Sequence, residues 1–174
     1  TNQKTYINLE GIKEPILIAR NISPLELVSL RHQLKGIILE DGSVGSHTTI
    51  VSRALNIPLL IQTKDIINKI SNGDKIILDA DQGLVYLRPN KAVSELYISK
   101  LKLRNKAKKT FLAAKNLEAK TLDNKKIFLM MNAGLMADLP SLDDSGADGV
   151  GLYRTELQFL ISNKVPKRAE QAEI

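Results

Sequence analysis

The chain contains no cysteine and no tryptophan, and aromatic residues make up only 4% of its 174 residues. The absence of cysteine excludes a disulfide framework, a thiol nucleophile and a metal site with cysteine ligands. With so few aromatic residues, leucine, isoleucine, valine and alanine must fill the core of a chain that is 43% hydrophobic. The lack of cysteine is also typical of a protein from a reducing compartment.

Long hydrophobic runs are lacking as well. No apolar run approaches the roughly 20 residues of a membrane-spanning helix. The opening residues show no basic segment followed by an apolar one, which a secretory signal would require. We therefore expect a soluble, cytoplasmic protein with no membrane partner.

The formal charge of +6 is concentrated in one segment. Residues 91–120 carry nine basic and two acidic side chains, a net charge of +7, so the rest of the chain is close to neutral. A basic stripe is compatible with nucleic-acid binding, but no aromatic stacking pattern accompanies it and leucines recur along it. We interpret the segment as a solvated helix face and expect no nucleic-acid partner, with a basic binding module as the distant alternative.

Short apolar segments alternate with helical patterns in the first half of the chain. The sequence predicts strands at 16–19, 36–39 and 58–61, helices at 25–34, 46–56 and 63–70, and a hairpin formed by 75–79 and 84–87. This alternation is typical of a compact α/β domain. The closing hairpin predicts a sheet that is not purely parallel.

A long polar pattern without glycine or proline predicts a linker helix from residue 91 to about 119. Strands are then predicted at 127–131 and 149–153, around a helical stretch at 137–145. A (β/α) barrel begins in this way, but a complete barrel needs roughly 250 residues. We therefore predict an α/β fold with a small domain over residues 1–90, a linker helix over 91–120, and the first strands of a truncated barrel over 121–174.

One histidine stands at the start of a predicted helix. The stretch GSVGSHTTIVSRALNIP, residues 42–58, places His47 between a turn rich in glycine and serine and an apolar pattern at helical spacing. The first turn of a helix has free backbone N–H groups, which bind phosphate. A neutral imidazole is a good nucleophile near pH 7, and the helix dipole disfavours the imidazolium form. This setting favours a phosphohistidine intermediate.

The neighbours of His47 suit this chemistry. Ser46 and Thr48 offer hydroxyl donors to phosphate oxygens, and Gly45 lets the backbone approach closely. The stretch lacks the lysine of a P-loop, and no Ser-His-Asp set or histidine metal cluster accompanies it. From spacing alone an ordinary polar histidine is the alternative, and His32, on an evidently exposed helix, is interpreted in that way.

Three segments resemble the phosphoenolpyruvate-utilising enzymes. SHTTIVSRALNIP resembles their phosphohistidine swivelling domain, of β/β/α architecture, and NGDKIILDADQGLVYLRP resembles that domain's closing segment. GADGVGLYRTELQFL, residues 146–160, is similar to the start of the barrel domain in the enzyme I branch, the phosphoenolpyruvate–protein phosphotransferases. Tyr153 before Arg-Thr-Glu favours that branch, and an enzyme like pyruvate phosphate dikinase or phosphoenolpyruvate synthase is the alternative.

The resemblance implies that His47 accepts a phosphoryl group from phosphoenolpyruvate, with Mg²⁺, and passes it to a histidine of a small HPr-type carrier protein. It leaves open whether the pathway is sugar transport or nitrogen regulation. Arg154 matches an arginine that grips the phosphate of phosphoenolpyruvate, although an ion pair with Asp148 or Glu156 is the structural alternative. Arg53 matches the family's helix arginine near the active histidine.

Other family features fall outside this chain or depart from the pattern. The Mg²⁺ ligands and the dimer interface belong to later parts of the barrel, so we expect no metal ligand here and a homodimeric parent enzyme. The isolated chain is expected not to phosphorylate itself from phosphoenolpyruvate. Gly45 stands where the family usually has threonine, and Ser43 where it often has glycine. Leu27 stands where enzyme I commonly has a threonine that can bond the active histidine.

Overall fold

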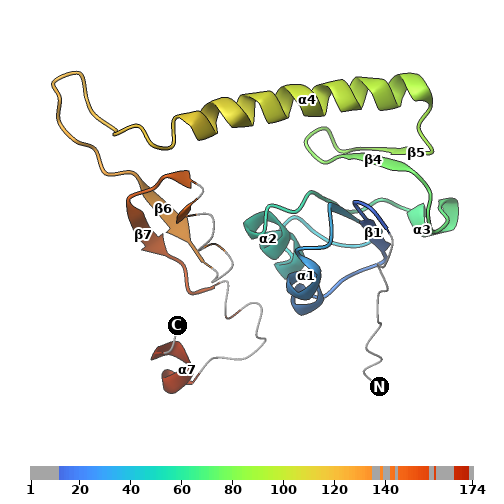
Figure 1. Cartoon of the computed structure of the whole chain (residues 1–174). Coiled ribbons are helices and arrows are strands. Elements are labelled where there is room, and N and C mark those ends of the chain that lie inside the picture. Colours follow the sequence, from blue (N-terminus) through green and yellow to red (C-terminus); the bar gives the residue numbers. More distant parts are fainter. Residues whose placement is uncertain are drawn as a thin grey trace. The chain divides into compact units, whose positions relative to one another are not determined.

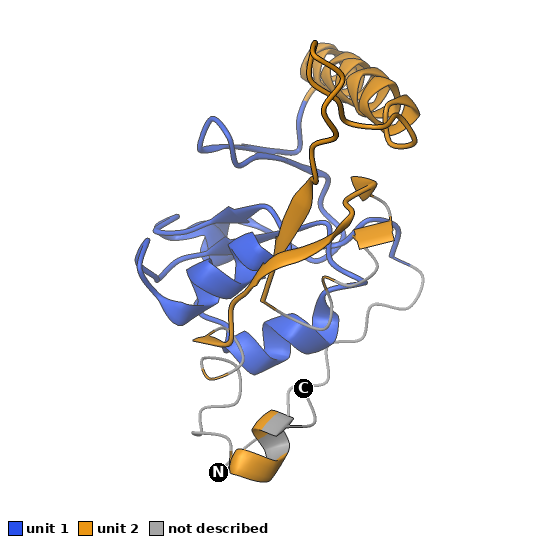
Figure 2. Ribbon diagram, turned by 90° about the vertical axis from the view of Figure 1, so that its left-hand side faces the viewer, with its two compact units in different colours: residues 1–89 blue, residues 90–174 orange. Residues whose placement is uncertain are grey.

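The computed structural model describes residues 12–134, 138, 142, 143, 145–156, 159 and 167–172. The chain divides into two compact units, residues 1–89 and residues 90–174, which are coloured separately in Figure 2. Each unit has its own sheet or sheets.

A three-stranded parallel sheet forms the centre of the first unit. It contains β1 (Ile16–Ala19), β2 (Gly36–Leu39) and β3 (Leu59–Leu60) in that spatial order. All four residues of β2 are buried, because both edges of the strand pair with neighbours and none of its side chains is polar. The first two strands have the predicted bounds, and the third is shorter than the segment 58–61 that the sequence predicts.

Helices α1 (Pro24–Leu30) and α2 (His47–Ala54) connect the parallel strands. Because the strands lie side by side in chain order, two right-handed crossovers place both helices on one face of the sheet, where they contact each other (Figure 1). Leu27 and Val51, one from each helix, are fully buried. The carboxyl ends of β1 and β2 therefore meet the amino ends of both helices at one edge of the sheet.

Helix α1 begins with a capping box. The Ser23 hydroxyl accepts from the Glu26 amide at 3.3 Å, and the Glu26 carboxylate accepts from the Ser23 amide at 2.9 Å and from its hydroxyl at 2.7 Å. The helix ends at Leu30, four residues before the predicted end, because the chain must turn into β2. Lys35 N already donates to Pro15 O beside the sheet.

Helix α3 (Ile66–Lys69) is much shorter than the helix predicted over 63–70. Asp65 occupies its N-cap position, with a left-handed φ of 61° and no side-chain capping bond. A helix of one turn without a cap has little intrinsic stability, so the buried side chain of Ile66 anchors it.

The predicted hairpin is present as β4 (Ile76–Asp79) and β5 (Leu84–Leu87), which pair antiparallel. Among the described residues it forms a sheet of its own and does not extend the parallel sheet, which corrects the expectation of one mixed sheet. Side-chain packing joins the two layers instead. A Cβ at Gly36 would lie 2.7 Å from Leu78 Cδ2, so the hairpin approaches β2 where a side chain is missing.

The second unit begins with the long helix α4 (Lys91–Ala113), capped by Asn90, whose Oδ1 accepts from Val93 N at 2.9 Å. The helix has no buried residue and ends six residues before its predicted end, in turns over 114–117. In the part of the chain that the structure describes, no helix is both long and apolar enough to span a membrane.

Strands β6 (Met130–Ala133) and β7 (Gly149–Tyr153) form a parallel pair, and a short helix, α7 (Arg168–Ala172), follows. β7 has its predicted bounds, while β6 begins three residues later than predicted. The strands approach closely at Gly151, where a Cβ would lie 2.6 Å from Met130 Cβ. The helical stretch predicted at 137–145 falls largely outside the described residues.

We predict that the α1 cap depends on pH. Hydrogen bonds from the Ser23 side chain and backbone lower the pKa of Glu26 from its ordinary value of 4.5. A carboxylate with a lowered folded-state pKa stabilises the fold above the unfolded-state pKa, and this contribution is lost as the pH falls through the folded-state pKa. Glu26→Gln should therefore lower the free energy of unfolding by about 0.5 kcal/mol at pH 7, as expected for an exposed charged contact.

Urea unfolding followed by circular dichroism at several pH values between 7 and 3 measures this effect. The difference between wild type and Glu26→Gln should shrink as the pH falls below 4.5. Glu14→Gln, which removes the same charge outside the capping box, is the control. A difference that stays constant with pH would contradict the prediction.

Candidate functional site

His47 is the first residue of α2, and its side chain is exposed. Ser46 caps the helix, with its Oγ accepting from Thr49 N at 3.3 Å. Within the described residues, the imidazole of His47 makes no hydrogen bond, and neither do the backbone amides of His47 and Thr48. The helix therefore presents an accessible nucleophile beside two free N–H donors, which is a suitable arrangement for a phosphoryl group.

The turn before His47 is held in place at Gly42. Gly42 has a φ of 123°, and a Cβ there would lie 3.2 Å from Ile61 Cγ2, so only glycine fits. Gln62, itself in the left-handed region with a φ of 57°, donates from Nε2 to Gly42 O at 3.2 Å. Gly45 is different, because a Cβ there would meet nothing within 4 Å. Its value to the site is the open surface that it leaves beside Ser46.

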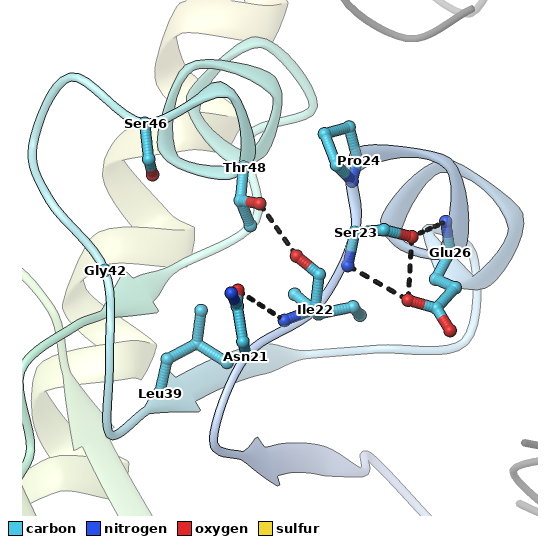
Figure 3. Close-up of a pocket in the computed structure, with 9 residues that line it drawn as sticks. All are labelled: Asn21, Ile22, Ser23, Pro24, Glu26, Leu39, Gly42, Ser46 and Thr48. Carbon is cyan, nitrogen blue, oxygen red and sulfur yellow. Dashed lines mark hydrogen bonds between the residues drawn. The ribbon is translucent and has the colours of Figure 1, made fainter. Parts of the chain in front are cut away.

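Thr48 fastens α2 to the loop that precedes α1. Its side chain is buried, and Oγ1 donates to Ile22 O at 2.8 Å (Figure 3). The sequence predicts that this hydroxyl assists phosphate binding, but here its proton is directed to a backbone carbonyl. In this structure Thr48 supports the site by fixing the position of the helix that bears His47.

A pocket of about 380 Å³ lies where the amino ends of α1 and α2 meet (Figure 3). Its walls come from the two helix starts and the ends of β1 and β2: Asn21, Ile22, Ser23, Pro24, Glu26, Leu39, Gly42, Ser46 and Thr48. Hydrogen bonds from Ser23 lower the pKa of Glu26, so the wall carries a negative charge at neutral pH. His47 does not line the pocket, and an anion would be accommodated better at the exposed face of α2.

Two further predicted features lie away from the histidine. Leu27 is fully buried in the core, so the place where enzyme I commonly has a hydroxyl is filled by packing. Arg53 is exposed in the last turn of α2, about 9 Å along the helix axis from His47 at 1.5 Å per residue. The structure does not bring Arg53 to the end of the helix that bears His47.

Arg154 belongs to the second unit and directly follows β7. Its backbone N donates to Ala133 O at 2.7 Å, and its side chain is exposed. Among the described residues no ion pair joins it to Asp148 or Glu156, and the Asp148 carboxylate accepts instead from Leu129 N at 2.8 Å. The carboxyl ends of parallel strands are where such sheets bind ligands, and this guanidinium is available to an anion there.

The described residues offer no metal site. Among them, no group of three or more histidine, cysteine, aspartate or glutamate side chains lies close enough to hold a metal ion. No Mg²⁺ ligand is therefore assigned among the described residues.

Thr49 and Gln62 also shape the site, although neither is among the residues predicted from the sequence. Thr49 Oγ1 donates to Ser43 O at 2.8 Å and lies 2.9 Å from Ser46 Oγ. The spacing of Ser46 and Thr49 is that of a capping box with threonine in place of glutamate, so a signal for Thr49 was present. No pattern in the sequence indicates the left-handed backbone of Gln62.

Two family descriptions match this chain. Residues 12–83 match "PEP-utilising enzyme, mobile domain", and residues 108–174 match "PEP-utilising enzyme, PEP-binding domain". A solved solution structure of Enzyme I (nEIt) is 28% identical, with a TM-score of 0.50, over 57% of this chain and 41% of that one. The likeness supports a mixed α/β fold of the kind found in that protein.

Curated relatives include proteins named phosphoenolpyruvate-protein phosphotransferase. The one from Haemophilus influenzae is 33% identical over 91% of this chain and 28% of its own length. The one from Buchnera aphidicola subsp. Baizongia pistaciae is 35% identical over 94% of this chain and 29% of its own length. The multiphosphoryl transfer protein of Shigella flexneri is 36% identical over 95% of this chain and 20% of its own length. The chain thus spans less than a third of the length of these relatives.

We predict that Thr48→Val lowers the free energy of unfolding of the first unit by about 1–3 kcal/mol, because it leaves the carbonyl of Ile22 buried without a donor. Thr48→Ser keeps the hydroxyl and should recover most of this loss. Urea unfolding of both variants measures the difference. Equal stability of Thr48→Val and Thr48→Ser would mean that the hydrogen bond does not hold the helix.

Proposed function

Because the chain belongs to the phosphoenolpyruvate-utilising enzymes, we propose that His47 is the residue that carries the phosphoryl group. One observation carries this proposal: in the part of the chain that the structure describes, the exposed imidazole at the first residue of α2 makes no hydrogen bond, and neither do the amides of His47 and Thr48. A residue that shuttles phosphoryl groups needs a nucleophile that a second protein can reach. It also benefits from the positive amino end of a helix dipole beside it.

The transfer involves two displacements at phosphorus. A lone pair on an imidazole nitrogen of His47 attacks the phosphorus of phosphoenolpyruvate, and the bond between phosphorus and the enolate oxygen breaks. The enolate leaves with that electron pair and takes up a proton to give pyruvate. In the second displacement, a histidine nitrogen of the acceptor protein attacks the same phosphorus, and the bond to His47 breaks. The amide dipoles of α2 stabilise the charge on the phosphoryl oxygens at each stage.

Arg154 supplies positive charge for binding the phosphate of the donor, phosphoenolpyruvate. Its exposed guanidinium at the end of β7 can bind two phosphate oxygens at once, and it neutralises charge as the enolate departs. In the same proposal the first unit is the swivelling domain, the acceptor is a small HPr-type carrier, and the parent enzyme uses Mg²⁺ and dimerises through its barrel. The names of the curated relatives support a phosphotransferase over a dikinase.

We expect phosphoramidate, a small chemical phosphoryl donor to imidazoles, to label the chain chiefly at His47. This donor needs none of the phosphoenolpyruvate contacts, so it tests the histidine alone. Intact-mass analysis should find one acid-labile phosphoryl group, which His47→Ala removes. The chain has two histidines, and His32, exposed on the turn after α1, is an internal control, so His32→Ala should label like the wild type. Equal labelling at both positions would mean that the setting of His47 adds nothing.

A second prediction concerns the donor. In the full-length parent enzyme, Arg154→Ala should slow labelling from phosphoenolpyruvate by about 10²-fold, the typical cost of losing one preorganised charge-stabilising group. Arg154→Lys should recover part of this rate, because it keeps the charge but loses the two-pronged geometry. Labelling from phosphoramidate should be unchanged in both variants. A rate from phosphoenolpyruvate equal to that of the wild type would remove Arg154 from the site.

A further inference from the structure

Thr49 joins the two sides of the turn that carries His47. Its Oγ1 donates to Ser43 O at 2.8 Å, across the turn, and lies 2.9 Å from Ser46 Oγ. Its backbone N donates to the same Ser46 Oγ at 3.3 Å. Ser46 N also donates to Ser43 O at 3.1 Å. One half-buried threonine thus fixes both residues that determine where the helix begins.

The protons in this cluster can be assigned by counting. The Thr49 hydroxyl has one proton, and since a carbonyl oxygen only accepts, that proton belongs to the bond with Ser43 O. In the pair of hydroxyls, Ser46 must then be the donor and Thr49 the acceptor. Ser46 Oγ also accepts from the Thr49 amide. The Ser46 hydroxyl is therefore held in one orientation by Thr49 from two directions.

We propose that Thr49 is a positioning residue for phosphoryl transfer at His47, an inference that rests on the function proposed above. Thr49 does not touch the phosphoryl group. It holds the Ser43–Ser46 turn in place, so that the helix start and the imidazole keep one geometry. Its Oγ1 also accepts the hydrogen bond of the Ser46 hydroxyl when that hydroxyl is not turned toward a phosphoryl group. Rotation of that hydroxyl toward a phosphoryl oxygen costs Thr49 one accepted bond and leaves the bond to Ser43 intact.

The contacts of Thr49 separate this role from ordinary helix capping. Ser46 alone satisfies the Thr49 amide, and Ser46 O accepts from Ile50 N at 3.1 Å in the usual helical pattern. The Thr49 hydroxyl adds nothing to the helix ladder. Its bond reaches backward, out of the helix, to a residue six positions earlier in the chain. Loss of this hydroxyl should therefore make the turn less rigid without unfolding α2.

The test compares three variants of the chain with phosphoramidate as the donor. Thr49→Val removes the hydroxyl with little change of shape and should slow labelling at His47 by about tenfold or more, since a misplacement of 1 Å can cost about 10²-fold. Thr49→Ser keeps the hydroxyl and should label at the wild-type rate. Thr110→Val is the matched control, because Thr110 Oγ1 donates within α4, to Lys106 O at 3.3 Å, and not to a turn.

Amide hydrogen exchange on the same samples gives a readout that does not depend on phosphorylation. In Thr49→Val, exchange at Ser46 N should rise at least severalfold, while exchange in the centre of β2 stays unchanged. Slow labelling with rescue by serine supports the proposal. Labelling of Thr49→Val at the wild-type rate, or unchanged exchange at Ser46 N, overturns it and leaves the role of His47 standing. No labelling of the wild type at His47 would overturn the proposed function, and this inference with it.

Discussion

The complete burial of β2 is the constraint on which the first unit depends. Its four apolar residues are buried and pair with β1, and Ile37 and Ile38 also pair with β3. Because the strand is central, both crossover helices must start at the same edge of the sheet, and the loops that precede them lie side by side. The bond from Thr48 to Ile22 O then joins those loops. The position of His47 therefore follows from the burial of β2 and not from the histidine itself.

Much of this arrangement could be predicted because its signals are local. The run GIIL and the apolar pattern after His47 determine β2 and α2 through burial, and these elements lie where the sequence predicts them. The helix ends were predicted less well, because the turn into the next strand decides them. Leu30 ends α1 where the chain must reach the sheet, and α3 keeps one turn anchored by Ile66.

The candidate site divides in the same way. The imidazole at a helix start could be identified from sequence, since a turn rich in glycine and serine before an apolar helical pattern is a local signal. The partners of Thr48, Thr49 and Gln62 could not, because each bond joins residues separated by a turn or a whole β–α unit. In the sequence, the hydroxyl of Thr48 resembles a hydrogen-bond donor to phosphate. In the structure it donates to the carbonyl of Ile22 instead.

Helix α4 follows a different rule from the rest of the chain. It buries none of its residues, and like charges recur at i, i+4 spacing, as at Lys100 and Arg104, which weakens an isolated helix. Within the described residues, no core constrains the identity of most of its side chains. Selection on α4 should therefore act on its length, its cap at Asn90 and its overall charge, so its sequence can drift faster between species than that of β2 while the protein keeps working.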